Sequence, residues 1–160
     1  MTIRFFKPAL ALLLGFMILL TGCQTPQQAT EVFEVPAGYR AVCWGSGVFM
    51  AVGTDSRIVR INNDGSVEQL PDQQWGTLHD IVYRNGQYVV VGDGGLIAVA
   101  GTDGVFKQVE SGTDNALLSI AVYGHVYVAV GSNGTVLTST DGETWEPLAV
   151  EVQNHFISVA

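Results

Sequence analysis

A 39-residue repeat is the feature of this chain that most restricts its fold. Segments 39–53, 78–92 and 117–131 align with one another without a gap. Four sets of residues share the same 39-residue step: Gly53, Gly92 and Gly131; Val42, Ile81 and Ile120; Val67, Phe106 and Trp145; and Leu70, Val109 and Leu148. A period near 40 residues made of short strands is typical of stacked or circular arrays, with the β-propeller as the first expectation. The repeat predicts an architecture and does not identify a ligand.

Each repeat is expected to form one four-stranded antiparallel blade. In the third copy, strands are expected at 117–123, 126–130 and 135–139 and around 145–150. The second of these is apolar on both faces, which favours a strand covered from both sides, as in a blade packed between two others. No segment longer than ten residues after the amino-terminal region has helical periodicity. The mature protein is therefore predicted to be all-β.

The repeats stop part of the way round such a ring. Blades are predicted at 39–77, 78–116 and 117–155, and residues 156–160 are in register with the first strand of a fourth blade. Propellers usually contain about four to eight blades, so about three blades make an incomplete ring. Three explanations stay open. The sequence is part of a longer propeller, or copies associate to complete a ring, or residues 31–36 cap an open arc.

The amino-terminal residues have the layout of a targeting segment. Arg4 and Lys7 precede an apolar run at 9–20, which is too short to span a bilayer. The run ends in Leu-Thr-Gly-Cys at 20–23, which resembles the lipobox of bacterial lipoproteins. The resemblance implies a signal peptide at 1–22 and lipid attachment at Cys23.

A short tether is expected to follow the lipid anchor. Residues 23–38 are mostly polar at their start, and Gln24 follows the cysteine. In enterobacterial sorting, an aspartate at that place favours the inner membrane, so glutamine favours the outer one. The resemblance thus implies a bacterial cell-envelope protein, held by lipid at the outer membrane more readily than at the inner membrane.

The mature chain is strongly acidic. Without Arg4 and Lys7 it has five basic residues against 15 acidic ones, which gives a net charge of −10. This balance argues against a nucleic-acid partner. Cys43 is then the second cysteine, and its repeat counterparts Val82 and Ala121 indicate a small interior position. The sequence has no Cys/His cluster and no dense run of oxygen ligands, so neither a metal nor a cofactor is predicted.

The turn before the expected fourth strand carries a second resemblance. Residues 139–145, Ser-Thr-Asp-Gly-Glu-Thr-Trp, resemble the Asp-box of bacterial neuraminidase (BNR) repeats, and the chain from 39 to 160 is similar to BNR-like and photosystem II assembly-factor propellers. The aspartate is expected to accept hydrogen bonds from its own turn, the glycine to allow positive φ, and the aromatic side chain to fill the gap between sheets. The predicted structural turn residues are Asp64, Gly65, Asp103, Gly104, Phe106, Ser139, Asp141, Gly142 and Trp145.

Sialidases share the Asp-box, so a glycoside hydrolase is an alternative. That family implies an arginine triad and an Arg-Ile-Pro start, but residues 57–59 are Arg-Ile-Val, and Arg40, Arg60 and Arg84 follow no such pattern. Glycoside cleavage needs two carboxylates at a defined separation, whereas the box aspartates recur as turn residues. The three histidines, His79, His125 and His155, occupy unrelated repeat positions. No catalytic residue is predicted.

The sequence therefore favours a non-catalytic, lipid-anchored envelope protein. It is expected to bind or scaffold a protein or glycan partner through loops displayed on a β-propeller, and self-association would complete the ring. The alternatives are a sialidase-like glycoside hydrolase fragment and a protein like the photosystem assembly factors. The second alternative calls for a basic patch, for which five basic residues are a poor supply.

Overall fold

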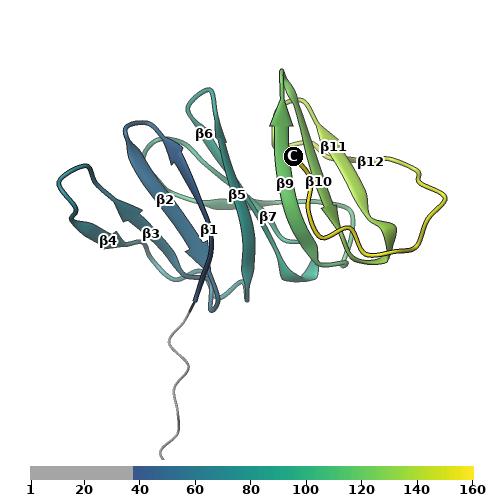
Figure 1. Cartoon of the computed structure of the whole chain (residues 1–160), viewed down its shortest axis with the longest axis horizontal. Coiled ribbons are helices and arrows are strands. Elements are labelled where there is room, and N and C mark those ends of the chain that lie inside the picture. Colours follow the sequence, from purple (N-terminus) through teal and green to yellow (C-terminus); the bar gives the residue numbers. More distant parts are fainter. Residues whose placement is uncertain (1–37) are drawn as a thin grey trace, which may run out of the picture. The chain divides into compact units, whose positions relative to one another are not determined.

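The computed structural model describes residues 38–160, which form three four-stranded antiparallel sheets (Figure 1). Blade 1 contains β1 (Tyr39–Gly45), β2 (Val48–Gly53), β3 (Ile58–Ile61) and β4 (Val67–Gln69). Blade 2 contains β5 (Leu78–Arg84), β6 (Gln87–Gly92), β7 (Ile97–Ala100) and β8 (Lys107–Val109). Blade 3 contains β9 (Leu117–Tyr123), β10 (Val126–Gly131), β11 (Val136–Ser139) and β12 (Glu146–Pro147). Strands pair in chain order within each blade.

Short turns hold each meander together. Asn85 and Gly86 join β5 to β6 with φ of 50° and 83°, and Ser46 and Gly47 join β1 to β2 in the same way. Positive φ at both central residues marks the hairpin turn whose twist matches that of the strands. Single-turn 3-10 segments, η1 (Asp93–Gly95) and η2 (Ser132–Gly134), link the second and third strands of blades 2 and 3. Within residues 38–160 no helix has the length and apolar character needed to cross a bilayer.

The blades pack face to face in chain order. The first strand of blade 2, β5, lies beside both β1 and β9 (Figure 1). Tyr88 and Val90 of β6 pack in the core shared with blade 1, while Val89 and Val91 pack in the core shared with blade 3. All four are almost completely buried, and each such burial contributes about 1.5–3 kcal/mol. The prediction of an all-β fold is confirmed. Strand β6 is covered on both faces, whereas β10, for which the same cover was expected, packs against a described blade on one face only.

Three strands of blade 3 differ in their bounds from the expectation, and the smallest difference is that β10 ends at Gly131 instead of 130. The third strand of blade 3 begins at Val136 instead of 135, and β12 covers only Glu146–Pro147 instead of 145–150. Only Glu146 and Pro147 of this outermost strand pair with β11. After Leu148 the chain leaves the sheet edge and returns toward β9.

Residues 156–160 are assigned no regular strand, yet they contact blade 3 in the repeat register. The Phe156 N–H donates to the Gly131 carbonyl at 3.0 Å, and the Val159 N–H donates to Ser119 Oγ at 3.3 Å. The Ile120 N–H donates in the equivalent way to Asp80 Oδ2 at 2.9 Å. The last residues therefore lie where the first strand of a following blade belongs.

Several predictions fall outside the described residues. They are the signal peptide at 1–22, lipid attachment at Cys23, most of the tether, and the capping segment 31–36. They stay predictions.

Candidate functional site

The turn at 139–145 in blade 3 and its counterparts at 61–67 and 100–106 are here called the box turns, and the one in blade 3 is built around a single carboxylate. Asp141 Oδ1 accepts hydrogen bonds from the N–H groups of Glu143 at 2.8 Å and Thr144 at 2.7 Å, and from the Ser139 hydroxyl at 3.0 Å. Gly142 has φ of 78°, which a glycine adopts without steric cost. The Trp145 indole N–H donates to the Gly142 carbonyl at 2.9 Å. The aspartate thus orders its own turn.

These hydrogen bonds make the turn sensitive to acid. Donation from the Thr144 and Glu143 N–H groups and then from Ser139 lowers the pKa of Asp141 from 3.8 to about 2. The stability that Asp141 contributes is present above about pH 4 and is lost as the pH falls through about 2. We expect Asp141→Asn to flatten the decline in unfolding midpoint between these pH values. Urea unfolding at a series of pH values tests this.

The neighbouring Glu143→Gln is the control, because it removes an exposed carboxylate of the same turn and leaves the three hydrogen bonds in place. This variant should keep the acid dependence of the parent protein. An Asp141→Asn variant with the parent's full dependence would contradict the assignment.

The other two box turns are simpler. In blade 2, Asp103 Oδ1 accepts the Val105 N–H at 3.1 Å, and Phe106 is buried. In blade 1, Asp64 Oδ1 accepts the Ser66 hydroxyl at 2.6 Å and the Ser66 N–H at 2.9 Å, and these bonds lower the pKa of Asp64. In blade 1 the position of the aromatic side chain that fills the gap between sheets is held by Val67, which is 62% exposed. That role fails in blade 1 because no described blade covers this side chain.

The glycines of the box turns touch the preceding blade. A Cβ on Gly104 would come within 2.5 Å of Arg60 Nη2, and one on Gly142 would come within 2.8 Å of Gln87 Oε1 and 3.1 Å of Val89 Cγ2. Each turn therefore sits against the blade before it. The glycine is needed for this close approach as well as for its positive φ.

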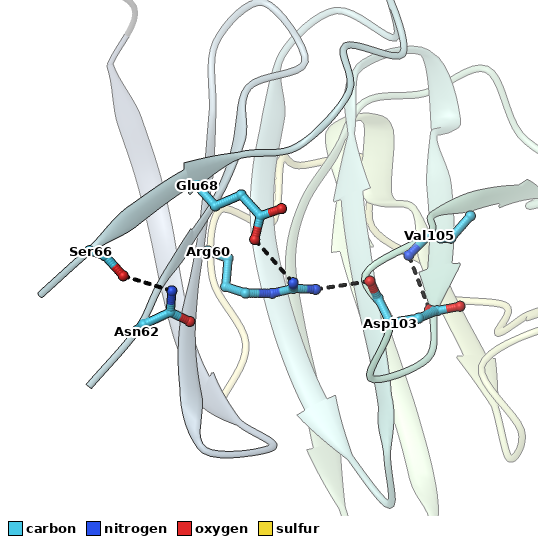
Figure 2. Close-up of polar contacts among 6 residues, drawn as sticks. All are labelled: Arg60, Asn62, Ser66, Glu68, Asp103 and Val105. Atoms are coloured by element: carbon cyan, nitrogen blue, oxygen red, sulfur yellow. Dashed lines mark hydrogen bonds and ion pairs between the residues drawn. The ribbon is translucent and has the colours of Figure 1, made fainter. Parts of the chain in front are cut away.

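Arg60 ties blade 1 to the box turn of blade 2 (Figure 2). Its Nη1 donates to Glu68 Oε2 at 3.2 Å, and its Nη2 donates to the Asp103 carbonyl at 2.9 Å. Sequence reasoning did not single out this role. The available signal was that Arg60 breaks the repeat, since its counterparts are Val99 and Thr138.

A second set of contacts joins the blades at their first strands and hairpin ends. Asp80 Oδ2 accepts from the Ser119 hydroxyl at 2.8 Å as well as from Ile120, so blade 2 is linked to blade 3. The Tyr88 hydroxyl donates to the Gly45 carbonyl at 2.7 Å and links blade 2 to blade 1. Sequence reasoning missed both links, because they depend on which blade faces which.

Other residues considered in the sequence lie apart from the box turns. His79 Nε2 and Asp93 Oδ1 are 2.7 Å apart. Partial burial of Asp93 opposes its ionisation, but hydrogen bonds from His79 and the Thr77 N–H outweigh it and lower its pKa. Burial, with the Asp80 charge adding to it, raises the pKa of the half-buried Cys43 thiol to about 12. Among residues 38–160, no group of three His, Cys, Asp or Glu side chains is placed to hold a metal ion.

The fold of this chain is similar to that of known proteins. Neither family models nor curated proteins match this chain. It is similar in structure to virginiamycin B lyase from Staphylococcus aureus, with a TM-score of 0.63 and 15% identity over 73% of this chain and 43% of that one. It is also similar to YCF48 from Cyanidioschyzon merolae, with a TM-score of 0.58 and 12% identity over 69% of this chain and 39% of that one.

Both neighbours are β-propellers, and at such identities the likeness shows the fold alone. The chain spans about two fifths of the length of these solved structures. The sheets, their order and the neighbours together define a β-propeller protein built from four-stranded blades.

Proposed function

We propose that this chain is a non-catalytic, lipid-anchored module of the bacterial envelope that binds or scaffolds a protein or glycan. The absence of catalysis is proposed because the carboxylates of the box turns are engaged in hydrogen bonds. Asp64, Asp103 and Asp141 each accept hydrogen bonds from within their own turns. A carboxylate engaged in this way stabilises a turn, whereas glycoside cleavage needs a pair facing the scissile bond.

The proposed mechanism is rigid display. Adjacent blades are linked through Tyr88, Arg60 and Asp80, so the strand-connecting loops are carried on a packed framework. Loops held by a rigid scaffold pay little ordering entropy when a partner binds. Affinity capture from envelope extract with the tagged full chain tests this, with competition by excess untagged chain as the criterion of specific binding.

Anchoring rests on the resemblance of residues 20–23 to a lipobox, and it is tested at Cys23. In a bacterial host, the full chain should incorporate labelled palmitate and fractionate with membranes, because several acyl chains together give stable attachment. Cys23→Ser should lose both properties. Cys43→Ser is the matched control and should keep them. Label retained by Cys23→Ser would contradict the anchor.

The enzymatic alternative is tested directly. A fluorogenic sialoside should be turned over no faster by the folded full chain than by buffer alone. Turnover above that background would support the sialidase-like reading.

The likeness to YCF48 favours one second candidate, a protein of the photosystem-assembly type. The mature form of this chain would have five basic residues, and two of them already make contacts between blades. Arg60 donates to the Asp103 carbonyl, and Arg84 lies over the Tyr127 ring. This leaves little charge for a basic patch. Specific co-purification of photosystem subunits would favour this candidate over a general envelope module.

A further inference from the structure

Blade 1 presents an apolar face that no described blade covers. We call it the leading face. Its exposed or partly exposed side chains are Tyr39, Val42, Trp44, Phe49 and Val67. The rings of Trp44 and Phe49 pack edge to face with centroids 4.7 Å apart, and Trp44 is 51% exposed. A contiguous apolar surface of this kind on a β-sheet marks an interaction site.

The repeat shows what covers such a face. The counterparts of these residues in blade 2 are Leu78, Ile81, Tyr83, Tyr88 and Phe106. All five pack in the core that blade 2 shares with blade 1. In blade 3 the same positions, including Leu117, Ile120, Tyr127 and Trp145, pack against blade 2. At both interfaces within the chain, a leading face is thus covered by the opposite face of the preceding blade.

Blade 3 presents that opposite face, here called the trailing face, at its outer end. A depression of about 480 Å³ there is lined by Val126, Thr138, Asp141 and Glu146, among others. Val126 and Thr138 are the counterparts of Gln87 and Arg60, which receive the box turns of the following blades. The depression is therefore the seat for one more box turn.

Tyr123 marks the same face at the β9–β10 turn and is 91% exposed. Its counterparts contact the next blade: the Gly45 carbonyl accepts from the Tyr88 hydroxyl, and Arg84 lies over the Tyr127 ring at 6.0 Å. In the repeat, Phe49 is the counterpart of Tyr88 and Tyr127. The two open faces thus carry an aromatic pair that matches in register.

We propose that a second copy of this chain docks its leading face on the trailing face of blade 3. Phe49 of one copy then packs against Tyr123 of the other, and the turn at Asp64 and Gly65 enters the depression. The pairing continues the blade-to-blade interface that the chain already makes twice. It is independent of lipid attachment and of any envelope ligand, so it goes beyond the proposed function.

Residues 156–160 occupy part of the space that β1 of the second copy would need. They lie in the place of a following first strand, held by the Phe156 and Val159 hydrogen bonds, and Ile157 is 77% exposed. The seven-residue β1 of the second copy has to displace them. This exchange is favoured because β1 arrives already paired with β2, whereas residues 156–160 are assigned no regular strand.

The contact is head to tail, so the surfaces on the two copies differ. Such contacts form a ring if the rotation closes and a filament if it does not. Two copies of the blades at 39–155 make six, within the usual range of about four to eight. The proposed contact is therefore compatible with a closed ring of two copies.

Sedimentation of the full chain in density-matched detergent tests the proposal. The parent protein should have twice the protomer mass. Trp44→Glu on the leading face and Tyr123→Glu on the trailing face should each weaken association by about tenfold or more. Circular dichroism should show that both variants keep the β fold, because both side chains are exposed in the protomer. Val105→Glu is the control and should still dimerise, since this exposed apolar residue lies in the turn of blade 2 that faces blade 1 of the same chain.

Mixing the variants identifies the geometry. A Trp44→Glu copy keeps an intact trailing face and a Tyr123→Glu copy keeps an intact leading face, so an equimolar mixture should form one-to-one pairs that neither variant forms alone. A parent protein that sediments as a folded protomer overturns the proposal. So does a dimer that is lost in Trp44→Glu but kept in Tyr123→Glu, because it would join two leading faces.

Discussion

Trp145→Ala should lower the free energy of unfolding by about 3–5 kcal/mol, the usual cost of truncating a buried aromatic side chain. Trp145 is buried between blades 2 and 3, in one cluster with Val89, Leu117 and Leu137. Removing the indole also leaves the Gly142 carbonyl without its donor. Equilibrium urea unfolding followed by far-ultraviolet circular dichroism measures the loss.

The repeat supplies a matched control for this variant. Val67 occupies the same repeat position in blade 1 but is exposed in the single chain, so Val67→Ala should cost about 0.5 kcal/mol or less when unfolding is measured on the monomeric protein at low concentration. Trp145→Phe should lie between the two, because Phe106 fills the same place in blade 2. Equal losses for Trp145→Ala and Val67→Ala would show that the core between blades 2 and 3 is not formed as described.

Gly95→Ala should be nearly as damaging, at about 2–5 kcal/mol, since left-handed backbone strain and overpacking add. Gly95 has φ of 71° in the turn between β6 and β7, and an added Cβ would lie 1.7 Å from the Thr113 carbonyl oxygen. That carbonyl belongs to the connection into blade 3, and it is backbone that cannot rotate away. The same urea titration measures the effect.

A variant at the preceding residue, Gly94, allows the cost of backbone strain to be measured apart from the cost of overpacking. Gly94 also has positive φ, 63°, but a Cβ there would meet nothing within 4 Å. Gly94→Ala should therefore cost only the backbone strain, about 1–2 kcal/mol or less. Asn133, with φ of 54°, shows that a side chain is accommodated at the equivalent place in blade 3. If the two alanine variants were equally stable, the close approach to Thr113 would be wrong.

Blade 1 shows how the same position adapts when glycine is absent. Ser56 replaces Gly95 there with φ of 56°, and it is buried. Its hydroxyl accepts the Trp75 N–H, and its own N–H donates to the Gly76 carbonyl at 2.6 Å. The connection into blade 2 is thus shaped around the serine side chain. The sequence shows that serine replaces glycine here, but it could not indicate the hydrogen bonds that accommodate the serine.

Most of the blade architecture could be predicted from the sequence, because it depends on near neighbours. The strands at 117–123 and 126–130 and the turn at Asn85 and Gly86 follow from alternation and turn chemistry over a few residues. The hydrogen bonds that Asp141 accepts also lie within its own turn. The outermost strand was predicted too long, since only Glu146 and Pro147 pair with β11.

The contacts between blades could not be predicted in the same way. Arg60, Asp80 and Tyr88 reach partners 39 to 43 residues away, so their roles depend on which sheet faces which. Sequence patterns within one repeat indicate contacts over a few residues and give no information about partners in the next repeat.

By itself, the sequence determined the 39-residue period, the strands and the box turns, since these arise from local hydrogen bonding and from polarity alternating along one strand. Only the tertiary structure decided which repeat positions are buried. Val67, Phe106 and Trp145 hold the same place in three blades, yet the first is exposed and the other two are covered. The reason is physical: burial depends on whether a preceding blade is present, and blade 1 has none among the described residues.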